Sequence, residues 1–533
     1  MAASRTVLRR SAAAAPRPRP RAGRLAVQGL VALGLTVLAV AIRDPRYLLT
    51  RSYWLDEGWV VDSVRAPLHQ LELLTSSTPV GWTLLLRLVP PVGGPERHRL
   101  LPLAFAALTA LAAWRLGAML GRGSGRWAWL YGLACGIAGA ASVAVLDHTW
   151  LKQYTAEAFV AVALALLLAR VELAWSWPTL AAYAAAGAAG FLVSNTAPLV
   201  SAGGLGGLWL VTLAARRWSR LPALAATTVV LGLADLVVYQ ALANNGGNPA
   251  LRGYWRLRYL SLDDGLGSAA QLVGRRLAAE LGSLGWGPWW LALALIGVGL
   301  VALWWAGLPA LALAVPAVGA ELVVLGFAGA YPFLERRTAI FYAALLTVTA
   351  AAGLATLARL GLEHRATAPL AVAGLVVAGV LLVPGWARAG RGDIPGEDVK
   401  AQVADVLARS RPGDAVLVTF AASFSFAYYW PDRPAFVPTT VNTAVSFMPT
   451  FPGRPELVLV HQPRSGRAMA EGLDRSLRLG RGRAWVVTGS PDELATLRRR
   501  AEGVRFVARP GRATLAVATG PGGLRSDRSS QRR

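Results

Sequence analysis

Long apolar runs alternate with short polar segments along most of the chain. Residues 25–42, 127–146, 221–243 and 308–327 each form an apolar run of at least about 18 residues, the length that crosses a bilayer as a helix. Further apolar runs lie at residues 100–120, 159–173, 180–194, 197–214, 289–304, 340–357 and 369–386. The pattern predicts a polytopic α-helical membrane protein with about eleven transmembrane helices.

The composition supports this prediction and excludes other classes. Hydrophobic residues make up 55% of the sequence and charged residues only 16%, whereas soluble proteins are about 25% charged. The net charge of +25 would suit a nucleic-acid-binding protein, but most of the chain is too apolar for that class, and arginines beside membrane helices account for much of the excess. The single cysteine, Cys135, excludes an intrachain disulfide and a cysteine-cluster metal site.

The distribution of arginines predicts the orientation of the helices. Residues 1–24 carry many arginines and no acid, so we expect a disordered cytoplasmic tail, after which residues 25–42 cross outward. Residues 39–41 resemble a signal-peptidase site, but the polytopic chain that follows favours an uncleaved helix. Residues 79–92 are too short to span and are expected to lie along the outer surface as a helix, which makes the loop 121–126 cytoplasmic.

The alternative, in which residues 79–92 span the membrane, would place this basic loop outside. In the preferred orientation, the long loop 244–285 and everything after residue 388 are external. Abundant Ala, Gly and Arg with little Lys suggests a GC-rich bacterial genome, so the expected location is a bacterial plasma membrane.

The C-terminal part of the chain has the pattern of a small α/β domain. Helix patterns at 399–410 and 465–479 alternate with β-rich runs at 415–420, 456–461 and 484–488, and Ser490 with Glu493 has capping-box spacing before a helix at 494–502. The expected domains are the basic tail (1–24), a transmembrane catalytic domain (25–387), an external α/β domain (388–520) and a disordered tail (521–533).

In this topology, two clusters of polar residues lie near the outer side of the membrane. Charged side chains at membrane level cost free energy, so their presence calls for an explanation. Asp56 and Glu57 lie among aromatic residues at 53–59, and a carboxylate there can act as a general base or bind a metal with its neighbour. Residues 147–157 form the second cluster; its candidate site residues are His148, Lys152, Tyr154 and Glu157.

A third cluster, at residues 331–337, contains Tyr331, Arg336 and Arg337. Two outward-facing arginines oppose the positive-inside bias, and guanidinium groups bind phosphate oxygens well. Each cluster also has a structural explanation: a solvated loop acid, a helix end with an acid at its N-terminus, or arginines paired with Glu335 or lipid phosphate. Together, however, the clusters predict transfer of a group from a lipid phosphate, with a carboxylate as base and cations that stabilise the leaving phosphate.

The chain resembles the protein-mannosyltransferase and aminoarabinose-transferase branch of the glycosyltransferase C superfamily. The resemblance covers residues 25–510 and is carried by short stretches: WLDE at 54–57, STPVGW at 77–82, RLLP at 99–102, LKQYTAE at 151–157, and YPF at 331–333 with Arg337. Glu157 stands where the branch often has Asp, which affects any metal or acceptor role of this residue. Val80 stands where the branch has a second proline.

The resemblance implies an enzyme that takes a sugar from a polyprenyl-phosphate donor on the outer leaflet, with Asp56 as the catalytic base. Metal dependence varies within the superfamily, so a divalent cation held by Asp56 and Glu57 stays open. The sequence does not name the sugar, and the acceptor can be a glycan, a lipid or a protein.

Two other classes of function stay open. A transporter or flippase of a lipid-linked sugar predicts charges near the bilayer midplane and an internal repeat. We see no repeat, and the unusual charges lie at one face, with Asp235 and Glu321 as intramembrane exceptions. A non-catalytic membrane scaffold, whose external domain binds a partner, would need no acid in the first loop.

Overall fold

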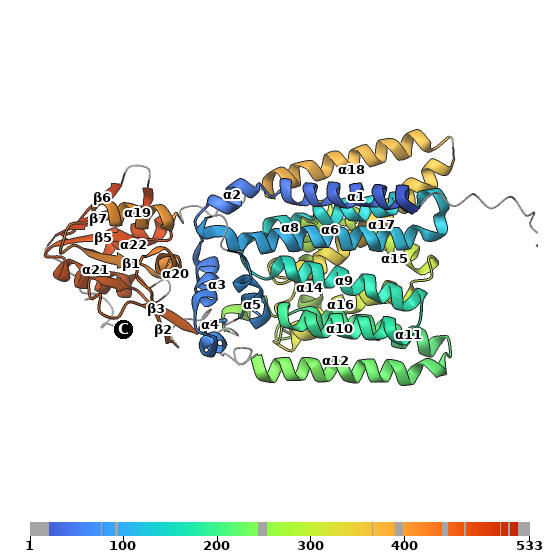
Figure 1. The fold of residues 1–533 in the computed structure, drawn as a ribbon, viewed down its shortest axis with the longest axis horizontal. Coiled ribbons are helices and arrows are strands. Elements are labelled where there is room, and N and C mark those ends of the chain that lie inside the picture. Colours follow the sequence, from blue (N-terminus) through green and yellow to red (C-terminus); the bar gives the residue numbers. More distant parts are fainter. Residues whose placement is uncertain are drawn as a thin grey trace, which may run out of the picture.

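The computed structural model describes residues 21–520, apart from Ser76, 91–93, 243–252, Arg365, 390–397, 440–445, 463–464, Glu502 and 510–511. Long helices lie side by side, and an α/β domain formed by the C-terminal part of the chain lies beyond one end of this helical bundle (Figure 1). Helix α1 begins at the opposite end. Of the tails expected at 1–24 and 521–533, residues 1–20 and 521–533 fall outside the described residues, and residues 21–24 belong to α1.

The helical bundle is built from the apolar runs. Its helices are α1 (Arg21–Ala41), α6 (Leu100–Leu120), α7 (Ala128–Ala140), α8 (Val143–Asp147), α9 (Tyr154–Leu173), α10 (Trp177–Val193), α11 (Ala197–Ala214), α12 (Leu221–Leu242), α15 (Trp289–Trp305), α16 (Pro309–Phe327), α17 (Ile340–Glu363) and α18 (Ala368–Ala389). Each run that was predicted to span coincides with a helix, and the run at 127–146 is divided between α7 and α8.

Within the described part of the chain, six helical segments are long and apolar enough to cross a membrane, and four shorter apolar helices accompany them. The prediction of a polytopic helical membrane protein is therefore confirmed, while the total of eleven spans stays a prediction.

Short elements lie at the domain end of the bundle. They are α2 (Pro45–Thr50), α3 (Leu55–Arg65), η1 (Leu68–Gln70), α4 (Leu71–Thr75), α5 (Val80–Arg87) and η2 (Pro95–Arg99). The segment expected as a surface helix contains α5, which at 8 residues is too short to span. The segment predicted as a long loop contains η5 (Arg256–Arg258) and a further helix, α14 (Gly265–Ser283), which packs on the bundle through Leu272 and Leu277. The connections η3 (Gly121–Trp127) and η4 (Trp218–Arg220) complete the membrane part.

The C-terminal domain is an α/β sandwich around a five-stranded sheet. Its elements are α19 (Val399–Arg409), β1 (Ala415–Val418), α20 (Phe420–Tyr429), β2 (Ala435–Pro438), β3 (Phe447–Thr450), β4 (Leu457–Leu459), α21 (Gly466–Leu479), β5 (Arg483–Val487), α22 (Pro491–Arg500), β6 (Arg505–Arg509) and β7 (Arg512–Thr519). The strand order is β4-β1-β5-β7-β6; β4, β1 and β5 are parallel, and β7 pairs antiparallel with β5 and β6. Strands β2 and β3 form a separate antiparallel pair.

The predicted β runs became β1, β4 and β5, and the predicted helices became α19, α21 and α22. Ser490 caps α22 by accepting a hydrogen bond from the Glu493 backbone N–H at 3.4 Å. Helix α20 and strands β2, β3, β6 and β7 were not predicted.

The C-terminal domain packs directly on α3. One cluster of buried side chains joins Trp59 and Val60 of α3 to Phe424 of α20 and Phe447 of β3. Helices α3 and α20 approach so closely that a Cβ on Gly58 would lie 2.6 Å from the backbone nitrogen of Ser425. Only glycine fits there without separating the helices.

Hydrogen bonds reinforce this interface. The Tyr429 hydroxyl accepts from the Tyr53 backbone N–H at 2.9 Å and donates to Glu96 Oε1 at 2.9 Å. Lys400 of α19 also pairs with Glu96 Oε1, at 2.8 Å. The C-terminal domain therefore contacts the chain on both sides of the WLDE segment.

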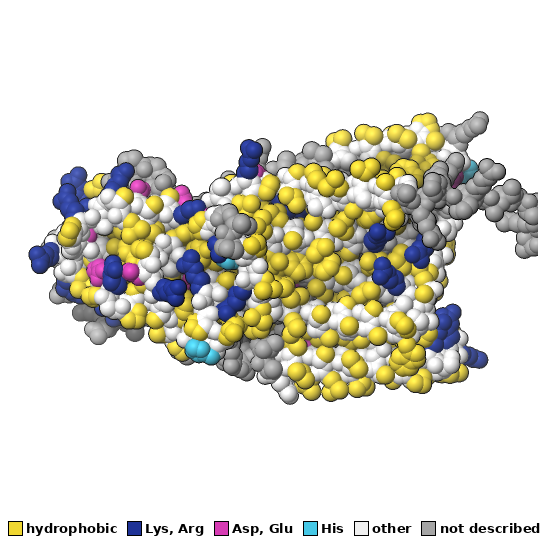
Figure 2. Space-filling model, in the orientation of Figure 1, with side chains coloured by type: hydrophobic (Ala, Val, Ile, Leu, Met, Phe, Trp, Pro, Cys, Tyr) yellow, Lys and Arg dark blue, Asp and Glu magenta, His cyan; other side chains and the backbone are white. Residues whose placement is uncertain are grey.

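The surface of the bundle is mostly apolar. Figure 2 shows hydrophobic side chains over the helices, whereas Lys, Arg, Asp and Glu gather on the C-terminal domain, and Lys and Arg also lie near the opposite end of the bundle. This distribution suits helices whose outer faces contact lipid.

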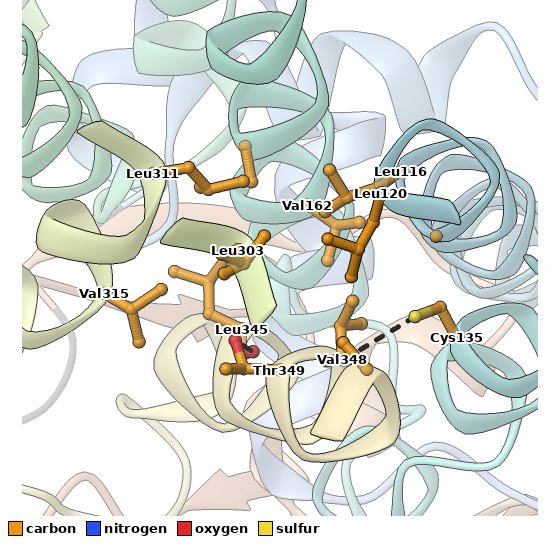
Figure 3. Close-up of a pocket in the computed structure, with 13 residues that line it drawn as sticks. Leu116, Leu120, Cys135, Val162, Leu303, Leu311, Val315, Leu345, Val348 and Thr349 are labelled. Atoms are coloured by element: carbon orange, nitrogen blue, oxygen red, sulfur yellow. Dashed lines mark hydrogen bonds between the residues drawn. The ribbon is translucent and has the colours of Figure 1, made fainter. Parts of the chain in front are cut away.

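A hollow inside the bundle is lined by aliphatic side chains (Figure 3). It has a cavity volume of about 20 Å³ between α6, α7, α9, α15, α16 and α17, and the Cys135 thiol at its edge lies 3.7 Å from the Val348 carbonyl oxygen. None of its lining residues in the described structure is charged.

Candidate active site

Helix α3 carries the acidic pair of the first segment. It begins after Trp54, whose backbone is extended, and Asp56 and Glu57 lie in its first turn, where carboxylates interact favourably with the helix dipole. Successive residues on a helix point about 100° apart. The two acids therefore face different surroundings: the side chain of Asp56 is 19% exposed, and that of Glu57 is fully buried.

Asp56 lies against two cations from distant parts of the chain. Its Oδ2 is 2.9 Å from Lys152 Nζ and 3.7 Å from an Arg337 Nη1. We call these three residues the Asp56 cluster. The structure thus brings together one residue from each of the three predicted clusters, at the end of the bundle that bears the C-terminal domain.

Lys152 is held in place by the segment that precedes α9. Its ammonium lies over the Trp59 ring, 4.5 Å from the ring centroid, in a cation–π contact. The neighbouring Leu151 is fixed at both backbone groups: its N–H donates to Glu57 Oε1 at 3.0 Å, and its carbonyl accepts from Trp82 Nε1 at 2.8 Å. The position of Lys152 therefore depends on α3 and α5 as well as on its own segment.

Arg337 is held by a compact loop before α17. Glu335 Oε2 accepts from the Arg337 backbone N–H at 3.0 Å, and Glu335 Oε1 lies 3.5 Å from Arg337 Nε. Arg337 Nη2 donates to the Tyr254 hydroxyl at 3.0 Å, and the guanidinium lies 5.5 Å from the Trp255 ring centroid. With Nε and Nη2 engaged, Nη1 is the group directed toward Asp56.

Arg336 faces a different set of acids. Its charge acts on Asp147 at the end of α8 and on Glu280 of α14. Burial raises the pKa of Glu280 to about 7, against the nearby charge of Arg336. Of the two predicted arginines, only Arg337 therefore belongs to the Asp56 cluster.

The remaining predicted site residues surround the cluster. Tyr154 is within electrostatic reach of Asp56 and Arg337, and its ring centroid lies 6.0 Å from that of His148. Burial lowers the pKa of His148, which keeps its imidazole neutral at pH 7. Glu157 is buried in the first turn of α9, within reach of Lys152. Tyr331 donates to the Thr338 carbonyl at 2.9 Å and so closes the loop that carries Arg337.

Glu57 belongs to a buried ionic network. Its Oε1 accepts from Arg99 Nε at 3.0 Å, its Oε2 pairs with Arg99 Nη2, and Arg51 lies 3.4 Å from Oε1. Burial raises the pKa of the Glu57 carboxyl, but the charges of Arg99 and Arg51 and the hydrogen bonds from Arg99 and Leu151 outweigh it and hold the pKa below its usual range. Arg99 also donates to the carbonyls of Leu48, Arg51 and Ser52.

The two first-turn acids do not converge on one point, as a shared metal ion would require. Glu57 is engaged with Arg99 and Leu151, while Asp56 already faces two cations. Among the described residues, no group of three or more His, Cys, Asp or Glu side chains could hold a metal ion. The Asp56–Glu57 pair therefore does not fit a chelating site in this arrangement.

Several residues of the site were not predicted as site residues from the sequence. Trp59, Tyr254 and Trp255 support the two cations, and Arg99 anchors Glu57. Arg99 lies in the RLLP stretch that carried the resemblance, so the resemblance could have identified it as a site residue. No pattern in the sequence connects Tyr254 and Trp255 to Arg337.

No protein-family model and no curated protein sequence matches the chain. Among solved structures, it is similar to ArnT from Cupriavidus metallidurans bound to undecaprenyl phosphate, with a TM-score of 0.53 and 16% identity over 94% of this chain and 98% of that one. ArnT in the apo state gives a TM-score of 0.52 and 16% identity, with 93% and 98% covered. Archaeal oligosaccharyltransferase AglB from Archaeoglobus fulgidus, in complex with an inhibitory peptide and a dolichol-phosphate, gives 0.49 and 11%, with 95% and 75% covered. The likeness to ArnT shows that the two chains share a fold, which is the fold class expected from the sequence.

Proposed function

We propose that this protein is a membrane glycosyltransferase that transfers a sugar from a polyprenyl-phosphate donor to an acceptor on the outer face of the membrane. The Asp56 cluster is the observation that carries the proposal. A carboxylate and two cations from three separate segments meet at the end of a membrane bundle, where the phosphate of a membrane-embedded donor would lie. The shared fold with ArnT, which was crystallised with undecaprenyl phosphate, supports a donor of this lipid class.

The roles of the three side chains follow from their chemistry. Lys152 and Arg337 bind the donor phosphate and stabilise the charge that develops on it as the sugar leaves. Asp56 accepts the proton from the acceptor hydroxyl. The acceptor oxygen forms a bond to the anomeric carbon, the bond from that carbon to the phosphate oxygen breaks, and its electron pair stays on the phosphate. Attack from the face opposite the phosphate inverts the anomeric centre.

Glu57 is assigned a positioning role instead of a direct one. Its carboxylate contacts Arg99 of η2 and the backbone of Leu151, so it fixes α3 relative to the segment that carries Lys152. Tyr331 positions Arg337 through its loop, and Arg336 supports the site through Asp147 and Glu280. Tyr154, His148 and Glu157 form the buried wall beside Asp56, where Glu157 is a candidate contact for the acceptor.

A divalent cation is not required by this arrangement, and no step is assigned to one. The expectation is that a chelator leaves transfer unchanged. If chelation abolished transfer and added metal restored it, Asp56 would be reassigned as a metal ligand, with the cation joining the donor phosphate.

The proposed location is a bacterial plasma membrane, with the N-terminus in the cytoplasm and the C-terminal domain outside. The catalytic domain would comprise residues 25–387, and the α/β domain residues 388–520. The structure places the start of α1 and the C-terminal domain at opposite ends of the bundle, as this orientation requires.

The experiment that tests the proposal is a transfer assay with a panel of radiolabelled polyprenyl-phosphate sugars. Membranes containing the wild-type protein are compared with membranes containing Asp56→Asn at equal protein level. We expect at least one donor to be consumed by the wild type and not by the variant. Transport of a labelled lipid-linked sugar across vesicles without transfer would support a flippase instead, and no activity with any donor would favour a scaffold.

A further inference from the structure

The two cations proposed to bind the donor phosphate are already paired with an acid. Lys152 Nζ is within 2.9 Å of Asp56 Oδ2, and Arg337 Nη1 is within 3.7 Å of the same oxygen. The three side chains are between 10% and 25% exposed, so their charges are less screened than those of surface groups. A phosphate that binds both cations must compete with the Asp56 carboxylate for them.

The exchange of one anion for the other is balanced in charge. A sugar–polyprenyl phosphate is a phosphodiester with one negative charge, the same as an ionised carboxylate. Two anions sharing two cations at contact distance would repel each other. Replacement of Asp56 by the phosphate keeps the charge beside Lys152 and Arg337 unchanged.

The supports of the two cations differ, which indicates which one moves. Arg337 stays anchored by Glu335 and Tyr254 whether or not Asp56 is present. Lys152 has a flexible side chain whose ammonium contacts Asp56 and the face of Trp59. Lys152 can therefore turn from the carboxylate to a phosphate oxygen while Arg337 remains in place.

We infer that Asp56 and the donor phosphate are alternative partners of Lys152 and Arg337, so that donor binding releases the Asp56 carboxylate to act as the base. The inference rests on the proposed function. Before the donor binds, the Asp56 carboxylate is engaged with both cations and is not available to an acceptor hydroxyl. After the donor binds, the same carboxylate is free for the acceptor hydroxyl. The site then deprotonates an acceptor only when a donor is in place.

The test is the equilibrium affinity of the purified protein for the methyl ester of undecaprenyl phosphate, a phosphodiester with one negative charge like the donor, measured by tryptophan fluorescence at fixed salt concentration and without divalent metal. Asp56→Asn removes the competing charge and keeps the shape of the side chain. We expect this variant to bind the lipid about tenfold more tightly than the wild type, equivalent to about 1.4 kcal/mol. Asp263→Asn, which changes an exposed acid outside the site, is the matched control and should bind like the wild type.

Lys152→Ala and Arg337→Ala separate the inference from the proposed function. If both weaken lipid binding but Asp56→Asn binds no more tightly than the wild type, the exchange is refuted while the donor site stands. If neither changes lipid binding, the donor site itself is refuted. A tighter Asp56→Asn variant cannot result from misfolding, because misfolding would weaken binding.

Discussion

The substitution Glu57→Gln tests whether this acid positions the site or takes part in the chemistry. Glu57 and Arg99 are both 0% exposed in their side chains. The substitution leaves the Arg99 guanidinium buried with only backbone carbonyls and a neutral amide as partners. Removal of one member of a buried ion pair costs about 3–5 kcal/mol, so we expect the free energy of unfolding to fall by this amount.

The geometry supports the upper part of that range. Glu57 accepts hydrogen bonds from Arg99, Arg51 and the Leu151 backbone N–H. Glutamine offers one carbonyl oxygen, and its amide N–H groups would point at the N–H groups of Arg99. Glu363→Gln is a matched control, because it breaks an Arg359–Glu363 pair of 2.9 Å whose side chains are about one third exposed. That change should cost no more than about 0.5 kcal/mol.

The assay is thermal unfolding of the purified protein in detergent. Glu57→Gln should unfold at a clearly lower temperature than Glu363→Gln at pH 7. Because the pKa of Glu57 is lowered in the folded state, its stabilisation is present above the ordinary glutamate pKa of about 4.3 and is lost as the pH falls through the folded value. The difference between wild type and variant should thus be constant from pH 6 to 8 and shrink only in acid. If Glu57→Gln unfolds at the same temperature as Glu363→Gln but loses sugar transfer, Glu57 has a catalytic role and not a positioning role.

Three further predictions address the cations, the domain interface and the topology. Lys152→Ala and Arg337→Ala should each weaken use of the lipid-phosphate donor by about 1.5–3 kcal/mol, measured as kcat/KM for the donor. Normal donor kinetics in the double variant, with intact expression, would show that neither residue belongs to the donor site. Gly58→Leu should separate α3 from α20 and reduce transfer, whereas Gly267→Leu, with nothing within 4 Å of an added Cβ, should not; equal activity of the two variants would contradict a catalytic dependence on the C-terminal domain. In a background without Cys135, a cysteine at 268 or 465 should react with an impermeant reagent from outside and one at 124 should not; labelling at 124 would reverse the proposed orientation.

The membrane helices could be predicted from the sequence because the signal is local. A run such as 100–120 is apolar throughout, and the bilayer sets the length that it needs. Helix α14 was missed because its apolar positions alternate with Arg and Glu, as in a helix that covers the bundle with one face only. Strand β6 was missed because only three apolar residues lie between its terminal arginines, and β7 was missed because it consists mostly of Ala and Thr.

The site was predictable only in part. Asp56, Lys152 and Arg337 were identified because each is a charge that the predicted topology places at the outer side, in a stretch that resembles the family pattern. The partner of Glu57 was not predictable, because Arg99 is 42 residues away and the contact is made only in the folded protein. The charge pattern alone, without the family resemblance that singles out Arg337, could not distinguish Arg336 from Arg337, since the turn formed around Glu335 decides which of the two contacts Asp56.

The most direct test of a catalytic Asp56 is single-turnover sugar transfer by purified Asp56→Asn at saturating donor, beside Asp263→Asn as the control. A general-base role for Asp56 predicts that Asp56→Asn folds, binds undecaprenyl phosphate at least as well as the wild type, and transfers sugar about 10²–10⁴-fold more slowly, the usual contribution of a general base. Transfer by Asp56→Asn at a rate close to that of the wild type and the control would contradict it.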